Sequence, residues 1–245
     1  MKPTPSSLPE PHRLLAFGAH PDDLEFGAGG ILAREARAGT VLTLVVCSRG
    51  ESATHGTPAE REAEARQAAT LLGASIDFVD LGGDAHLAPS VPHALTLAAF
   101  VRRHRPRWVL APTTTPSQHP DHAVVGGLVR DAVRLARYGG VKELLGQPAH
   151  TIDHLFHYAV GPEGEPPGAA AVWVDVSDPD VIKAWTAAMS AHATQARSRE
   201  YVELQLTRAR LLGLRAGVGH AQALFPADPL VVDSLEQLGH GARRF

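Results

Sequence analysis

The sequence predicts an α/β fold: a Rossmann-like, doubly wound and mostly parallel sheet in three α/β/α layers, with an added C-terminal region of strands and helices. In the first half of the chain, short apolar runs alternate with helical patterns, which is the order of a parallel sheet with crossover helices. The run at 41–47 is apolar and rich in β-branched residues, as in a strand covered on both faces. The length of 245 residues fits one such domain or two small ones, and we predict a loose leader over 1–13 and a single domain over 14–245.

Each predicted element follows from a local pattern. Short apolar runs bounded by turn residues indicate strands, and apolar residues at helical spacing indicate helices. The helix at 58–72 has the clearest ends, because Thr57 can cap it, Glu60 completes a capping box and Gly73 stops it. The predicted strands are 14–18, 41–47, 77–81, 108–111, 154–160 and 171–176, and the predicted helices are 26–38, 58–72, 91–104, 122–135, 178–193 and 201–214.

The segment after the first predicted strand carries His20, Asp22 and Asp23 within four residues. Sites in open α/β sheets lie beyond the carboxyl ends of the strands, which is where these side chains fall. Two adjacent carboxylates at a buried strand end would repel each other unless one binds a cation or shares a proton. Imidazole and carboxylate groups suit zinc and neighbouring divalent metals. The alternative is structural: one aspartate caps the next helix and His20 is an ordinary loop residue.

A second His-Pro-Asp tripeptide comes after the strand at 108–111, and another histidine, His122, follows it directly. Its recurrence at a second strand end favours the metal site over the structural alternative. A catalytic zinc site takes three protein ligands and leaves a position for water, and His20, Asp23 and His122 supply that set. Asp22 would then be free to act as a general base on the attacking water.

His119 and Asp121 remain from the second motif as a histidine–carboxylate pair. Such a pair orients an imidazole for general acid work or for stabilising an oxyanion. We therefore predict catalytic roles for Asp22, His119 and Asp121. Zinc is the expected metal, and iron(II) and cobalt(II) share the same ligand types.

The two motifs, Ala19-His20-Pro21-Asp22-Asp23 with Glu25 and His119-Pro120-Asp121-His122, resemble the signatures of the LmbE-like, or PIG-L-like, family. This family consists of zinc-dependent deacetylases of N-acetylglucosaminyl compounds. The resemblance extends from about 14 to about 232 and is strongest to the bacillithiol-biosynthesis deacetylase branch. It implies a homo-oligomer, with a hexamer as one form. One departure bears on the exact substrate or on a supporting contact: the branch usually carries Ala-Glu-Gly-Phe where this chain has Gln222 and Ala223.

The resemblance also implies four substrate-binding residues. From the sequence alone, Arg61 is better explained as a solvated helix arginine that pairs with Glu64 or Glu60, but the resemblance places it at the active site. Tyr201 can be a half-buried helix residue or, by resemblance, a site hydroxyl. Asp84 is expected on the substrate side, and Arg208 is expected to bind an acidic part of the substrate.

The implied reaction is removal of an N-acetyl group from a small N-acetylated amino sugar, with N-acetylglucosaminyl malate as the first choice. An inositol conjugate, chitobiose and an antibiotic intermediate remain alternatives. So do another metal-dependent hydrolase, such as an esterase or a phosphoesterase, and a non-catalytic metal-binding protein. A phosphoesterase more often carries a second metal and extra carboxylates.

Composition and charge argue against other functional classes. The net charge of −3 argues against a protein that tracks nucleic-acid phosphates. No stretch is long and apolar enough for a membrane span, and 1–13 lacks the apolar centre of a signal peptide. The single cysteine, Cys47, excludes an internal disulfide and fits a reducing cytoplasm, which is the expected location.

Overall fold

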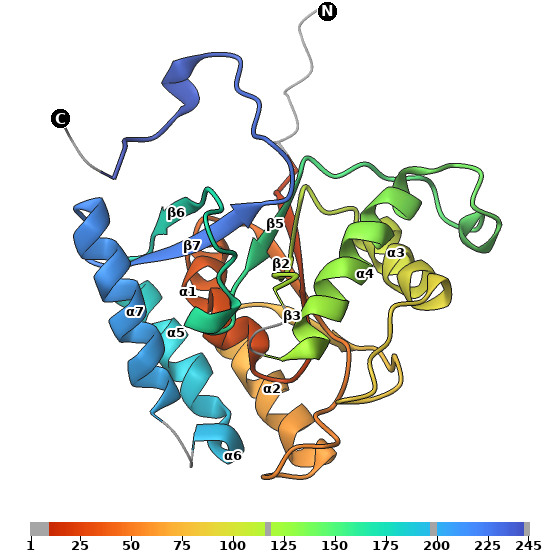
Figure 1. The fold of residues 1–245 in the computed structure, drawn as a ribbon, viewed down its shortest axis with the longest axis horizontal. Helices are drawn as coiled ribbons and strands as arrows, with labels where there is room; N and C mark the ends of the chain where they lie inside the picture. Colours follow the sequence, from red (N-terminus) through yellow and green to blue (C-terminus); the bar gives the residue numbers. More distant parts are fainter. Residues whose placement is uncertain (1–9, 116–118, 197–199, 243–245) are drawn as a thin grey trace, which may run out of the picture.

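A computed structural model describes residues 10–115, 119–196 and 200–242, and in them the chain forms one seven-stranded sheet flanked by helices (Figure 1). The predicted α/β class is confirmed. Most of the predicted leader, 1–9, lies outside the described residues. The strands are β1 (Arg13–Gly18), β2 (Val41–Val46), β3 (Ser75–Phe78), β4 (Trp108–Pro112), β5 (His154–Tyr158), β6 (Val172–Asp175) and β7 (Ala221–Pro226). The helices are α1 (Asp23–Arg37), α2 (Pro58–Leu72), α3 (Val91–His104), α4 (Pro120–Arg137), α5 (Pro179–Ala191), α6 (Ala193–Ala196) and α7 (Tyr201–Ala216), with 3₁₀ turns η1 (Lys142–Leu144), η2 (Pro162–Gly164) and η3 (Leu235–Gln237).

The strand order in the sheet is β3-β2-β1-β4-β5-β7-β6. Strands β1 to β5 pair in parallel, and β7 runs antiparallel to both β5 and β6. Strands β1 and β4 are neighbours in the sheet although two strands and three helices separate them in the chain. The direction of winding reverses between them, and ligands of open α/β sheets bind beyond the carboxyl ends of the strands at such a switch point.

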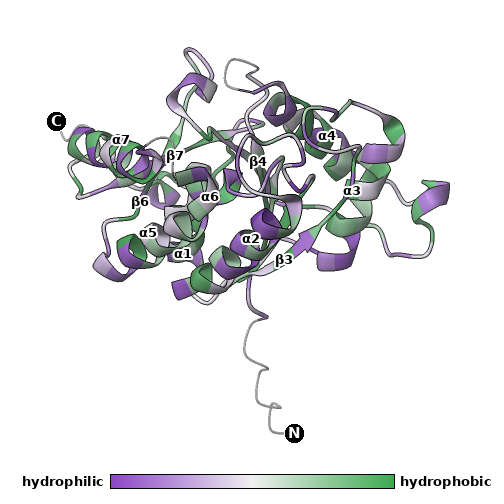
Figure 2. Cartoon of the chain, turned by 90° about the horizontal axis from the view of Figure 1, so that it is seen from below, coloured by the Kyte–Doolittle hydropathy of each residue, from purple (hydrophilic) through white to green (hydrophobic). Residues whose placement is uncertain are grey.

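Different helices cover the two faces of the sheet (Figures 1 and 2). Helices α1, α2 and α5 pack together on one face, and α3 and α4 pack together on the other. Strand β1 contributes to both cores: Leu14 and Ala16 lie on the α1 side, and Leu15 and Phe17 lie on the α3 side. Successive side chains of a strand point to opposite faces, which explains why this central strand is apolar at every buried position.

The glycines of α1 serve helix packing. A Cβ atom at Gly29 would lie 2.5 Å from Cδ1 of Trp185, a fully buried side chain of α5. The indole Nε1 of Trp185 donates to the carbonyl of Glu25 at 2.7 Å, so α5 and α1 are also joined by a buried hydrogen bond. These contacts fix the position of the first turn of α1 against α5, and the first sequence motif runs into that turn.

Two predicted elements have the wrong bounds, and a third begins two residues before its predicted start. Strand β3 covers Ser75–Phe78 rather than 77–81, because an edge strand tolerates polar residues that hide its start in the sequence. Helix α1 begins at Asp23 rather than at residue 26, and α4 begins at Pro120 rather than at residue 122. Each motif therefore continues directly into a helical first turn. Strand β7 is not among the predicted elements, and the other predicted ends agree to within two residues.

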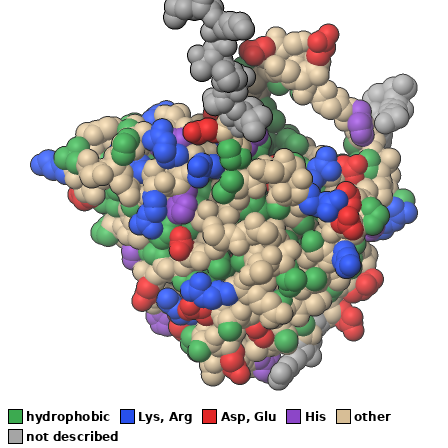
Figure 3. Space-filling model, turned by 180° about the vertical axis from the view of Figure 1, so that it is seen from behind, with side chains coloured by type: hydrophobic (Ala, Val, Ile, Leu, Met, Phe, Trp, Pro, Cys, Tyr) green, Lys and Arg blue, Asp and Glu red, His purple; other side chains and the backbone are tan. Residues whose placement is uncertain are grey.

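The surface is mixed in character. The face in Figure 3 carries acidic and basic side chains interspersed with apolar ones. Beyond β7 the chain leaves the body of the domain (Figure 1), and Val231 and Leu235 there are 86% and 79% exposed. Among the described residues, no helix is long and apolar enough to cross a membrane.

Candidate metal centre and pocket

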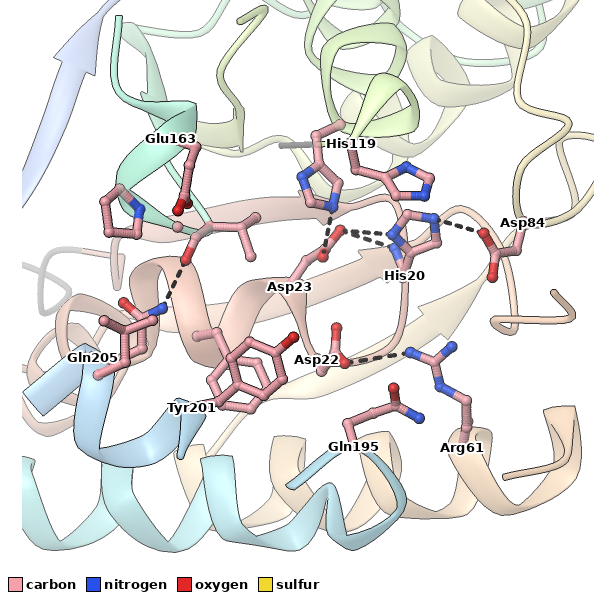
Figure 4. Close-up of a pocket in the computed structure, with 16 residues that line it drawn as sticks. His20, Asp22, Asp23, Arg61, Asp84, His119, Glu163, Gln195, Tyr201 and Gln205 are labelled. Carbon is pink, nitrogen blue, oxygen red and sulfur yellow. Dashed lines mark hydrogen bonds and ion pairs between the residues drawn. The ribbon is translucent and has the colours of Figure 1, made fainter. Parts of the chain in front are cut away.

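A cavity of about 440 Å³ opens at the carboxyl ends of β1 and β4 (Figure 4). Both sequence motifs reach it, as expected from the switch point between these strands. One wall is rich in histidine and aspartate, and the opposite wall is formed by η2 and α7. The lining residues are His20, Asp22, Asp23, Phe26, Arg61, Asp84, His119, His122, Val160, Gly161, Pro162, Glu163, Gln195, Tyr201, Leu204 and Gln205.

The predicted ligands His20, Asp23 and His122 lie together. Asp23 Oδ1 lies 3.0 Å from His122 Nε2, and Asp23 Oδ2 lies 3.6 Å from His20 Nδ1. The backbone amides of Ala19 and His20 also donate to Asp23 Oδ2, at 2.8 and 2.9 Å. Burial by itself would raise the pKa of Asp23, but the charges of His122 and His20 hold that pKa well below its usual range.

The chemistry of this cluster fits a divalent metal. Its two imidazole nitrogens and one carboxylate oxygen lie within 4.8 Å of one another, and all three side chains are buried. Two histidines and a carboxylate are a common ligand set of catalytic zinc sites. The buried carboxylate is already ionised among histidines, so a cation would not have to displace a proton from it.

Asp22 lies beside the cluster in a strained conformation. Its φ of 111° is rare for any residue other than glycine, and such a conformation costs on the order of 1–3 kcal/mol. Arg61 supports it: Nη2 donates to the carbonyl of Pro21 at 2.8 Å and lies 3.3 Å from Asp22 Oδ2. Burial raises the pKa of Asp22 to about 6, although the charge of Arg61 opposes the rise.

Arg61 is not the solvated helix arginine that the sequence alone favours. Its side chain is 5% exposed, and Nη1 also donates to the carbonyl of Gly50 at 3.4 Å. Glu64, the partner expected on that interpretation, instead accepts from the amide and hydroxyl of Thr194. A Cβ atom at Gly50 would overlap the guanidinium group, so this glycine leaves the space through which Arg61 reaches the pocket.

The expected pairing of His119 with the carboxylate of Asp121 is wrong. Asp121 Oδ2 lies 3.2 Å from His20 Nε2, and His119 Nδ1 accepts from the backbone amide of Asp121 at 3.2 Å. His119 is the N-cap of α4, which explains the contact. Because Nδ1 accepts, the neutral ring of His119 carries its proton on Nε2. Burial, followed by the charges of His20 and His122, lowers the pKa of His119 and favours that neutral form.

Two more of the four predicted substrate-binding residues, Asp84 and Tyr201, line the cavity. Asp84 Oδ1 lies 3.1 Å from His20 Nε2, and Tyr201 packs its ring 5.5 Å from that of Phe26. Arg208 is different. It pairs with Glu165 at 2.7 Å and is not among the residues that line this cavity, so its role in substrate binding stays a prediction.

Sequence reasoning missed several residues at the site. Glu163, which the structure places at the cavity wall, lies in a Pro- and Gly-rich segment whose sequence indicates only a turn. Near Asp22, His192 Nε2 lies 3.3 Å from Glu25 Oε2 in a buried ion pair. Burial would lower the pKa of His192, but the charge of Glu25 raises it. Glu25 belongs to the first motif, and its position one turn after Asp22 is a signal for this pair in the sequence.

Gln222, where the resembling branch carries glutamate, lies in the core rather than at the cavity. Its Oε1 accepts from the amide of Ile31 at 2.9 Å, and its Nε2 donates to the carbonyl of Gly27 at 3.4 Å. These backbone groups lie one turn apart in α1, so the amide of Gln222 bridges them. A carboxylate could accept from Ile31 but could not donate to Gly27. The departure from the branch pattern therefore changes the contact between β7 and α1.

Comparisons with known proteins agree with this geometry. A family model described as "PIG-L: GlcNAc-PI de-N-acetylase" matches residues 15–133. The structure of the conserved protein TT1542 from Thermus thermophilus is 33% identical, with a TM-score of 0.77 over 89% of this chain and 96% of that one.

Two curated relatives differ in their reactions. A diacetylchitobiose deacetylase from Thermococcus kodakarensis is 26% identical over 200 residues, which cover 75% of this chain and 70% of that protein. A 4-oxalmesaconate hydratase from Pseudomonas putida is 32% identical over 149 residues, which cover 55% and 57% of the two chains. The matches to several curated relatives span only 24% to 57% of their lengths.

Proposed function

Because the chain belongs to the PIG-L, or LmbE-like, family, we propose that it is a metal-dependent hydrolase that removes the N-acetyl group from an N-acetylated amino sugar. The observation that carries the proposal is the arrangement of one cavity wall. Two imidazoles and a carboxylate converge there, and a second carboxylate, that of Asp22, lies beside them. N-acetylglucosaminyl malate is the first candidate substrate, and chitobiose-type and inositol-linked sugars follow.

His20, Asp23 and His122 would hold the metal, with zinc, iron(II) and cobalt(II) as candidates. When bound there, such a cation supplies a Lewis acid for an amide carbonyl and lowers the pKa of water. Asp22 takes a proton from the attacking water, whose oxygen bonds to the carbonyl carbon, and passes that proton to the amine nitrogen as the C–N bond breaks. Acetate and the free amino sugar are the products.

His119 and Arg61 have separate supporting roles in this reaction. His119 lines the cavity with its Nε2–H free to donate to the carbonyl oxygen as negative charge develops there. Arg61 does not need to touch substrate, because its guanidinium group already holds Pro21 and Asp22. Its role in this proposal is to keep the base in its strained position.

The opposite wall suits a sugar ring. Phe26, Tyr201 and Leu204 offer an apolar surface, and Glu163 and Gln195 offer polar groups near it. Glu163 is exposed and forms no hydrogen bond or ion pair with the other described residues, so its carboxylate can accept from sugar hydroxyls. A polar face and an apolar face are what a pyranose ring requires.

A hydratase is the second candidate, and the identity with the Pseudomonas putida hydratase favours it. The same cluster and the same general base could serve the addition of water to a carbon–carbon double bond. The two candidates predict different products: a free amine and acetate in one case, and a hydrated acid in the other.

One experiment separates these candidates. Metal-stripped protein, with and without added zinc, is incubated with N-acetylglucosaminyl malate, N-acetylglucosamine, diacetylchitobiose and 4-oxalmesaconate. We expect zinc-dependent release of acetate from at least one sugar, and the preferred sugar identifies the branch. Hydration of 4-oxalmesaconate without acetate release from any sugar would overturn the deacetylase proposal. No reaction with metal bound would favour a different acyl substrate or a non-catalytic protein.

Glu163→Gln is expected to raise KM for the preferred sugar about 3- to 10-fold with little change in kcat, because it weakens ground-state binding at an exposed position. Initial rates over a range of sugar concentrations measure the two constants. Glu165→Gln is the matched control, since Glu165 pairs with Arg208 outside the cavity. An equal rise of KM in both variants, or a fall confined to kcat, would contradict the assignment of Glu163.

The predicted homo-oligomer remains part of this proposal, with a hexamer as one form. One described feature that such an assembly could cover is the segment after β7. Its exposed apolar side chains are Leu230, Val231, Val232, Leu235 and Leu238.

A further inference from the structure

We propose that Asp84 and Asp121 form a two-carboxylate clamp on Nε2 of His20, which fixes the orientation and protonation of this metal ligand. The inference rests on the metal centre of the proposed function but not on the identity of its substrate. It replaces the two roles expected from the sequence, in which Asp84 binds substrate and Asp121 orients His119.

The clamp is defined by three buried side chains. His20 Nε2 lies 3.1 Å from Asp84 Oδ1 and 3.2 Å from Asp121 Oδ2 (Figure 4 shows the contact with Asp84). His20 and Asp84 are each 7% exposed, and Asp121 is 3% exposed. A nitrogen that faces two carboxylates at these distances carries a proton, because a lone pair there would repel both.

The other nitrogen of the same ring points to the ligand cluster. His20 Nδ1 is the atom that lies 3.6 Å from Asp23 Oδ2. When Nε2 carries the proton of the neutral ring, Nδ1 holds the lone pair that a metal requires. Carboxylates that accept from the second nitrogen of a ligating histidine fix its tautomer and raise its basicity. The clamp therefore selects Nδ1 as the ligand atom.

Both carboxylates are held in place from outside the cluster. Asp84 Oδ2 accepts from the amide of Ser52 at 3.3 Å, and the hydroxyl of Ser52 donates to the Asp84 carbonyl at 2.8 Å. Asp121 Oδ2 also accepts from the amide of Ala85 at 2.8 Å. Asp121 thus joins the first turn of α4 to the loop after β3 that carries Asp84. Three strand ends, those of β1, β3 and β4, meet at one imidazole.

The same atoms could instead form a second metal site. Ligand atoms of His20, Asp84, His119 and Asp121 lie within 4.8 Å of one another. One observation favours the clamp: His119 Nδ1 already accepts from the amide of Asp121, so it has no lone pair left for a second cation.

The test measures metal binding rather than turnover. Zinc affinity is determined by chelator competition for the unmodified protein, Asp84→Asn, Asp121→Asn and the double variant, with metal content per chain. Each single change is expected to weaken zinc binding about 3- to 10-fold and the double change about 10- to 100-fold, because each carboxylate can partly replace the other. The cobalt(II) absorption spectrum should shift in the same order. Asp80→Asn is the control, an exposed aspartate of the same loop whose carboxylate contacts Gly82.

A second measurement uses the unmodified protein, so that a variant that fails to fold does not end the test. In nitrogen-15 histidine NMR spectra of the zinc-loaded protein, His20 should show a proton on Nε2 and zinc at Nδ1. Zinc at Nε2, two metal ions per chain, or unchanged affinity in a folded double variant would each overturn the clamp. A protein that binds one zinc in this way but releases no acetate would overturn the deacetylase proposal and leave the clamp standing.

Discussion

Replacement of Asp22 by asparagine is expected to lower kcat by about two to four orders of magnitude while the metal remains bound, which is the usual contribution of a general base. Asparagine keeps the shape of the side chain and its contact with Arg61 but cannot take a proton from water. The ligands His20, Asp23 and His122 are unchanged. Steady-state rates at saturating zinc, together with the metal content of the purified variant, measure the two parts of this prediction.

The geometry of Asp22 explains why no neighbour should replace it. Its backbone at φ 111° and the hydrogen bond of Arg61 to Pro21 point this carboxylate into the cavity beside the cluster. Asp84, another carboxylate at the cavity wall, already contacts His20 and Ser52. Asp80→Asn, on the exposed part of the same loop, controls for the general effect of losing a carboxylate. Full activity of Asp22→Asn at saturating metal would show that the base is another group.

The second large effect is expected for His122→Ala, which removes one of the three ligands. Zinc affinity should fall by more than the roughly 10- to 100-fold that loss of an outer-shell partner costs, and activity should fall with it. The variant also removes the partner of Asp23 Oδ1 at 3.0 Å, which leaves a buried carboxylate with one contact fewer. Chelator competition and zinc titration of activity measure both losses.

A matched histidine serves as the control for this change. His93 lies on α3, and its ring contacts the carbonyl of Ala88 away from the cavity. His93→Ala should bind zinc as the unmodified protein does. If His122→Ala retained the same affinity for zinc as the control, the metal would have to be held by a different set of side chains.

Local sequence determined much of the fold. The period of the apolar residues and the cap at Thr57 gave α2 its observed ends, and α3 was likewise predicted at its observed ends. The two His-Pro-Asp motifs could be placed at one edge of the sheet, because parallel strands with crossover helices bring their carboxyl ends together. That rule is enough to predict that His20 and His122 lie close together, although about a hundred residues of chain separate them.

The sequence did not predict which side-chain atoms contact one another. The carboxylate of Asp121 contacts His20 rather than His119, Arg208 pairs with Glu165 outside the cavity, and Gln222 bonds α1. For Arg61, the sequence allowed two interpretations, a solvent-exposed arginine paired with a glutamate or an arginine at the active site. Only the contacts of its guanidinium group with the carbonyls of Gly50 and Pro21 distinguish them.

The sequence by itself therefore determined the fold class, the edge of the sheet at which the site lies and the residue types that gather there. The tertiary structure decided which nitrogen faces which carboxylate, that the guanidinium group of Arg61 is buried, and that β7 lies between β5 and β6. The physical reason is the separation along the chain over which each kind of interaction acts. Periodicity, caps and turns act over a few neighbouring residues, whereas the bonds of His20 to Asp121 and of Gln222 to Ile31 join residues 101 and 191 positions apart. Such bonds are set by how whole helices and strands pack.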